Sequence, residues 1–150
     1  MNILKLYNKF QKYPRGNYLF TKAVTFKAPY FSSIKPYIVT LEAGKCVIEI
    51  KERRSITNHI GSIHAIAMCN LAELCGGLAV DASLDKSLRW IPKGMNVEYI
   101  KIAKGKLTGT ARIDPSAITV GDNNLEVLVT NSTDELVFRA VINMYVSAKK

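Results

Sequence analysis

Residues 64–80 read HAIAMCNLAELCGGLAV, and between Ala65 and Val80 they hold one charged side chain, Glu73. As a helix, this stretch would present apolar residues on nearly every face, which predicts a helix that is buried nearly all round. A sheet wrapped around the helix would bury it in this way. Because an unpaired carboxylate is costly to bury, we expect Glu73 to have a compensating partner or a function.

Alternation of apolar and polar residues, which is typical of strands, occurs on both sides of this helix. The strands expected before it are 37–42 and 45–51, joined by a turn at Ala43-Gly44. After it we expect a loop around Pro92 and Gly94 and then strands over 95–99, 107–113, 125–130 and 136–146, with a turn at Lys104-Gly105. Two helices, 3–10 and 18–27, precede all of these. The order predicts an α+β fold in which a mostly antiparallel sheet surrounds one central helix.

Composition is typical of a folded globular protein, with 48% hydrophobic and 22% charged residues. The length of 150 residues suits one domain, and without an internal repeat or a linker we expect residues 1–150 to form it. No apolar run approaches the length of a membrane span, and lysines interrupt the first apolar residues, which predicts a cytoplasmic protein without membrane contact.

The formal net charge of +9 is compatible with an anionic partner such as a nucleic acid, a membrane surface or a phosphate-bearing molecule. The basic residues are scattered, however, and show no aromatic RNA-binding signature, so nucleic-acid binding is not expected. Cys46, Cys69 and Cys75 are odd in number and lack CxxC spacing. They therefore predict neither a disulfide framework nor a metal site.

Small and partly polar residues lie one helical turn from Glu73 on either side, namely Cys69, Asn70, Gly76 and Gly77. This stripe is the expected wall of a binding site. Two alternatives stay open for the carboxylate itself, since Glu73 could lie at a solvated rim or pair with an arginine such as Arg89. The glycine pair could allow close approach at an interface, make room for a ligand, or end the helix.

Asn58, Gly61 and His64 are spaced by threes up to the start of the helix. The first N–H groups of a helix lack intrahelical partners and favour negative charge, so an oxyanion would be stabilised there. The alternative is structural, with Asn58 and Ser62 serving as ordinary turn and N-cap residues.

The pattern Asn58-x-x-Gly61-x-x-His64, followed nine residues later by Glu73, resembles the signature of hotdog-fold acyl-CoA thioesterases related to phenylacetyl-CoA thioesterase. The wider stretches NHIGSIHAIAMCNLAELCGGLA, RWIPKGMNVEYIK and YVSAKK are similar to an uncharacterised subgroup of that superfamily. The resemblance implies a long helix wrapped by a curved antiparallel sheet, with N-terminal helices in front of it.

The resemblance also implies roles for individual residues. Glu73 matches a general base or nucleophile, and Asn58 matches the residue that positions water or substrate. The N–H of Ala65, beside His64, matches the amide that polarises the thioester carbonyl. The family has a Gly-Gly pair where this chain has Ala65 and Ile66, which narrows the space for an acyl group, and Pro92 stands where some relatives place Ser or Thr.

Eight helical residues separate Ala65 from Glu73, about 12 Å at 1.5 Å per residue, so the two cannot contact one thioester carbon from the same chain. We therefore expect a homodimer, alone or as half of a tetramer, in which Glu73 of one copy faces Asn58 and Ala65 of the other. The substrate expected from the resemblance is an acyl-CoA or acyl-carrier thioester, with no separate cofactor. The further residues expected to bind it are Gly61, Asn70, Gly76, Gly77, Arg89, Trp90 and Lys93.

Within that set, Arg89 and Lys93, like Arg53 and Arg54, are candidates for binding the phosphates of CoA. Trp90 could stack on adenine or serve only in packing. The competing function is a non-catalytic acyl-CoA or lipid-binding module that keeps the pocket and lacks turnover.

Overall fold

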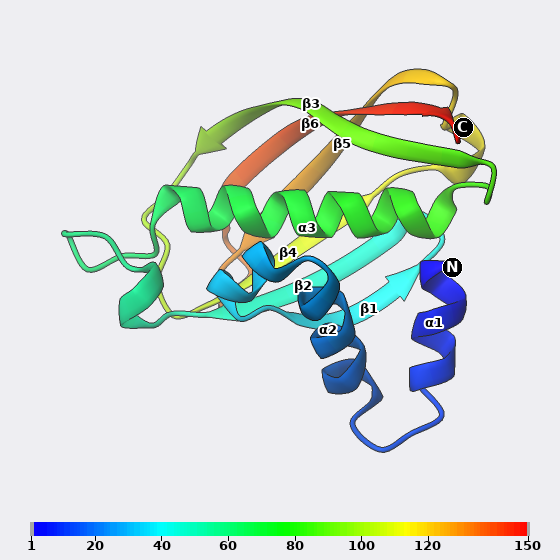
Figure 1. Ribbon diagram of the computed structural model, residues 1–150. Helices are drawn as coiled ribbons and strands as arrows, with labels where there is room; N and C mark the ends of the chain where they lie inside the picture. Colours follow the sequence, from blue (N-terminus) through cyan, green and yellow to red (C-terminus); the bar gives the residue numbers. More distant parts are fainter. Residues whose placement is uncertain (1, 150) are drawn as a thin grey trace.

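The computed structural model describes residues 2–149 and is built around the helix α3, Ala65–Ser83 (Figure 1). His64 caps the start of α3, because its Nδ1 accepts the N–H of Ile66 at 3.1 Å. Most of the 19 residues of α3 are buried, which confirms the expected central helix. The helix continues through Gly76-Gly77, so the interpretation of this pair as a helix end is wrong.

Six antiparallel strands wrap around α3 in the order β1-β2-β4-β5-β6-β3 (Figure 1). Their bounds are β1 Tyr37–Glu42, β2 Lys45–Lys51, β3 Leu88–Tyr99, β4 Lys106–Arg112, β5 Gly121–Thr130 and β6 Leu136–Ala148. Short 3₁₀ helices, η2 Arg54–Ile56 and η3 Pro115–Ala117, lie in the connections. The predicted order of two strands, one buried helix and four strands is confirmed.

The expected loop around Pro92 and Gly94 is wrong, because both residues lie within β3, at an edge of the sheet. The register of β3 against β6 shifts between these two residues. Proline has no N–H to donate to a neighbouring strand, so an edge strand with a local irregularity accommodates it. Lys104-Gly105 ends the connection that leads from this edge strand to β4 in the interior of the sheet, and Gly105 has φ +72°.

The N-terminal helices α1, Ile3–Phe10, and α2, Gly16–Lys27, are followed by the 3₁₀ helix η1, Pro29–Ile34 (Figure 1). They agree with the two predicted helices. Phe20 of α2 is fully buried, and its ring meets that of Tyr7 edge-on at 5.0 Å. Thr21 joins α2 to the sheet by accepting the N–H of Ile38 at 3.0 Å. These contacts fix α2 against α1 and β1, and η1, which follows α2, packs on α3.

Close packing of α3 on the sheet depends on small residues. A Cβ on Gly76 would lie 2.9 Å from Leu125 Cδ2, and one on Gly109 would lie 3.0 Å from Leu71 Cγ.

Contrary to the expectation that no apolar run reaches the length of a membrane span, α3 is long and apolar enough to do so, and 72% of its most apolar window is buried within the fold. The cytoplasmic location stays a prediction.

Candidate active site

The turn before α3 is organised by the side chain of Asn58. Its Oδ1 accepts the N–H groups of Ile60 and Ser62, both at 3.1 Å, and its Nδ2 donates to Ser62 Oγ at 2.8 Å. Gly61, within the turn, has φ +72° and is exposed, and a Cβ there would meet no atom within 4 Å. The turn requires a positive φ at this position, which glycine adopts without steric cost.

The first amide of α3 is available to a ligand. The N–H of His64 donates to Ile56 O at 2.8 Å, and the N–H of Ile66 donates to the His64 ring, but the N–H of Ala65 has no acceptor within residues 2–149. The N-cap is therefore His64, and Ser62 does not have the N-cap role considered for it. Ala65 presents an unpaired donor at the positive end of the helix dipole.

Asn58 and Ala65 share the wall of one cavity of about 330 Å³, whose opposite wall is formed by the chain from Tyr99 to Ala103. The N–H groups of Ile100 and Lys101 both donate to Val137 O, and the N–H of Ile63 donates to Ala103 O at 2.8 Å. These backbone hydrogen bonds hold the 99–103 segment against the start of α3.

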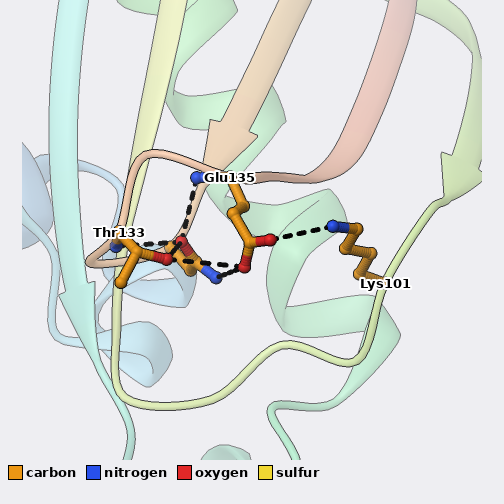
Figure 2. A network of polar contacts seen from close by, with 4 residues as sticks. Lys101, Thr133 and Glu135 are labelled. Carbon is orange, nitrogen blue, oxygen red and sulfur yellow. Dashed lines mark hydrogen bonds and ion pairs between the residues drawn. The ribbon is translucent and has the colours of Figure 1, made fainter.

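Figure 2 shows a further restraint on the same segment, in the network around the turn between β5 and β6. Lys101 Nζ lies 2.9 Å from Glu135 Oε1, and Asn131 Oδ1 accepts the N–H groups of Thr133 and Glu135 at 3.0 Å each. Hydrogen bonding from Lys101 is the largest of several interactions that lower the pKa of Glu135. Lys101, which lines the cavity, is thus held by an ion pair with Glu135.

Glu73 lines a different cavity, of about 420 Å³, between α3, the N-terminal helices and β3. The other residues of its lining are mainly apolar: Ile3, Val24, Lys27, Ala28, Phe31, Leu74, Gly77, Leu78, Asp81 and Trp90. Glu73 is half-buried and has neither a hydrogen bond nor an ion pair with any side chain of residues 2–149. The considered pair with Arg89 is not formed, since Arg89 Nε donates to Ser147 Oγ at 3.3 Å.

The two helical glycines contact different partners. Gly77 lies against the indole of Trp90, where a Cβ would come within 2.6 Å of Cη2. Gly76 instead faces Leu125 and Ile142 of the sheet. Trp90 is therefore packed on α3 and also borders the Glu73 cavity, whereas Gly76 belongs to the interface between helix and sheet.

Asn70 and His64 line a third cavity, of about 180 Å³, beside η1 and η2. Asn70 is 7% exposed, and its Nδ2 donates to Ser33 Oγ at 3.1 Å, while its Oδ1 has no partner among the residues described. Arg53 binds the Ser33 carbonyl and the Ser55 hydroxyl, which ties η1 to the region of η2 at the edge of this cavity.

The two remaining candidates, Arg89 and Lys93, are exposed on β3 and line none of these three cavities. Lys93 pairs with Asp122 at 2.9 Å and lies 4.9 Å from the centroid of the Tyr145 ring. The structure therefore brings Asn58 together with Ala65, and Glu73 together with Gly77 and Trp90, but it separates the two groups along α3.

Sequence reasoning missed the contribution of the 99–103 segment. The alternation placed Tyr99 on a strand, but no local signal indicated that the end of this strand lies opposite the start of α3 and forms a cavity with Asn58. Among residues 2–149, no three His, Cys, Asp or Glu side chains are placed to hold a metal ion together.

The curved antiparallel sheet around one long helix is the hotdog fold of thioesterase-like proteins. More narrowly, the chain belongs to the family described as a domain of unknown function, DUF4442, which matches residues 16–146. The comparison with curated proteins gave no match.

Solved structures with this fold include a structural-genomics protein that is 38% identical, with a TM-score of 0.87 and coverage of 98% of this chain and 99% of the other. PA5026 from Pseudomonas aeruginosa, described as a probable thioesterase, is 25% identical, with a TM-score of 0.77 and coverage of 83% and 91%. The thioesterase SAV0944 from Staphylococcus aureus is 20% identical, with a TM-score of 0.72 and coverage of 79% and 98%, and it supports the fold alone.

Proposed function

We propose that this protein hydrolyses an acyl thioester, carried by CoA or by an acyl-carrier protein, at a site shared between two copies of the chain. The observation that carries the proposal is the pair of complementary half-sites on α3. One half presents the free N–H of Ala65 beside Asn58, and the other presents the unpaired carboxylate of Glu73 in a mainly apolar cavity.

The chemistry follows from these groups. The Ala65 N–H donates to the carbonyl oxygen of the thioester and stabilises the negative charge that forms there. Glu73 takes a proton from a water molecule, the water oxygen attacks the carbonyl carbon, and the carbon–sulfur bond breaks. The proton on Glu73 then passes to the departing thiolate. In the nucleophilic alternative, Glu73 attacks the carbon itself and water cleaves the resulting anhydride.

A second copy is needed because the two half-sites lie about 12 Å apart along the helix axis, at 1.5 Å per residue. The edge strand β3 has a sheet partner on one side only, and an unpaired edge is a template for pairing with another chain. Ile91 on β3, 58% exposed, and Ile102 in the following segment, 70% exposed, are apolar surface that such a partner would cover. Two-fold pairing would produce two equivalent sites.

The acyl group fits best in the Glu73 cavity, because its walls are mainly apolar. Gly77 and Trp90 form part of those walls and set their shape. Arg89 and Lys93, exposed on β3, are the candidates for binding the phosphates of CoA. The proposed reaction uses no cofactor apart from the carrier of the acyl group.

The test is an assay of hydrolysis on a panel of acyl-CoA thioesters, in which the release of free thiol is measured. General acid–base groups contribute about 10²–10⁴-fold, so Glu73→Gln should lower kcat/KM by about that factor. Glu42→Gln, an exposed carboxylate change on β1, is the matched control and should leave turnover intact. Equal activity of Glu73→Gln and the wild type would reject the proposed role of this acid.

A non-catalytic acyl-thioester or lipid-binding module is the second candidate. One observation favours it: Ile66, which stands where the resembling family has glycine, directly follows the free amide and is 56% exposed. This function predicts tight binding of a nonhydrolysable thioether analogue of acyl-CoA together with no thiol release from any thioester of the panel.

A further inference from the structure

Tyr99 is the aromatic residue that ends β3, and its side chain faces the start of α3. Its hydroxyl lies 3.5 Å from Cys69 Sγ, and its ring centroid lies 5.7 Å from that of Phe138. The residue is 53% exposed and lines the same cavity as Asn58 and Ala65. Tyr99 thus borders a cavity that contains a free amide donor, and its hydroxyl contacts α3.

The position of Cys69 relates this hydroxyl to that amide. Cys69 follows Ala65 by four residues, so the two lie on the same face of α3, about 6 Å apart along the axis. Side chains on a helix lean toward its N-terminus, which brings Cys69 Sγ back over the turn that begins at Ala65. The Tyr99 hydroxyl contacts this sulfur, one helical turn beyond Ala65.

The hydroxyl is a suitable donor. Its hydrogen bond with Cys69, and to a smaller extent partial burial, raise the pKa of Tyr99, so the proton stays on the oxygen at neutral pH. A cysteine sulfur is a weak acceptor, and the hydroxyl can exchange it for an oxygen that carries negative charge, which is a stronger one.

We propose that Tyr99 is a second oxyanion donor, whose hydroxyl hydrogen-bonds to the thioester carbonyl oxygen together with the N–H of Ala65. This inference rests on the proposed hydrolysis and adds a residue to it. No bond to Tyr99 is made or broken in the reaction. The hydroxyl keeps its proton, and its hydrogen bond becomes stronger as charge develops on the carbonyl oxygen.

Tyr99→Phe tests the proposal, because it removes the hydroxyl and keeps the ring that packs on Phe138. Loss of one oxyanion donor costs about 10²–10³-fold in kcat, so we expect a loss near the lower figure with KM within about twofold of the wild type. Tyr37→Phe, which removes a half-exposed hydroxyl on the opposite edge strand β1, is the matched control and should keep full kcat. Thermal unfolding of both variants separates a catalytic loss from a folding defect.

The outcomes distinguish this inference from the proposed function. Wild-type protein that hydrolyses thioesters, together with a Tyr99→Phe variant of unchanged kcat, overturns the role of Tyr99 and leaves the hydrolase in place. An increase in KM with unchanged kcat means that the hydroxyl binds the ground state only, and it also overturns the proposal. Wild-type protein that releases no thiol from any thioester of the panel rejects the hydrolase itself.

Discussion

Gly77 and Trp90 are packed so closely that the helix has no room for a methyl group at this position. A Cβ on residue 77 would lie 2.6 Å from Trp90 Cη2 and 2.9 Å from Cζ2, so the indole must move. Overpacking of this kind costs about 1–3 kcal/mol. Replacing a glycine by alanine within a helix stabilises the helix by about 0.5–1 kcal/mol, so the cost of overpacking should exceed this gain.

Gly77→Ala should therefore destabilise the protein by about 1 kcal/mol and displace the indole toward solvent. Trp90 is the single tryptophan of the chain, so its fluorescence reports the displacement directly as a shift to longer wavelength. Gly76→Ala is the matched control. Its added methyl would meet the terminal Cδ2 of Leu125 at 2.9 Å, so stability should change but the emission wavelength should not. Unchanged emission from Gly77→Ala would contradict the packing described.

At the level of elements, the 99–103 segment is positioned by the turn between β5 and β6. The carboxylate of Glu135 accepts hydrogen bonds from Lys101 and from Asn131, and these lower its pKa (Figure 2). A group whose pKa is lower in the folded state stabilises the protein above its unfolded pKa, and this contribution is lost as the pH falls through the folded value.

Glu135→Gln should consequently lower the melting temperature at neutral pH, and the difference from the wild type should disappear in acid, where Glu135 is protonated. It should also loosen the 99–103 segment and lower kcat/KM. Glu49→Gln is the matched control, because it removes another surface ion pair, with Lys106, at a place that lines none of the three cavities. Equal effects of the two variants on kcat/KM would contradict a role for the turn in shaping the cavity.

For the whole molecule, the separation of the half-sites makes a prediction about mixed dimers. Glu73→Gln and Asn58→Ala should each be impaired alone. When the two variants are unfolded and refolded together, mixed dimers contain one site with both residues intact and one site with neither. Random assortment should then restore about one quarter of the wild-type activity.

The measurement is thioester hydrolysis at constant total protein, with analytical ultracentrifugation to confirm that the refolded mixture is dimeric. The control mixes each variant with itself through the same refolding procedure. If Glu73 and Asn58 act within one chain, the mixture will show no activity above the two controls.

Much of the architecture could be predicted because burial leaves a periodic pattern in the chain. The all-round apolar stretch from Ala65 predicted a central helix, and the period-two segments predicted the strands around it. Pro92 and Gly94 misled the prediction, because their turn preference is a local property, while the tolerance of an edge strand for proline depends on which strands lie beside it.

The local sequence by itself determined the central helix, the alternating strands around it and the isolated carboxylate of Glu73, since each of these follows from hydrophobicity and spacing along the chain. Only the tertiary structure decided that the indole of Trp90 packs against Gly77 and that Tyr99 lines the same cavity as Ala65. Such contacts join residues that are distant in the sequence, and their formation depends on the order and curvature of the strands, which no local pattern specifies.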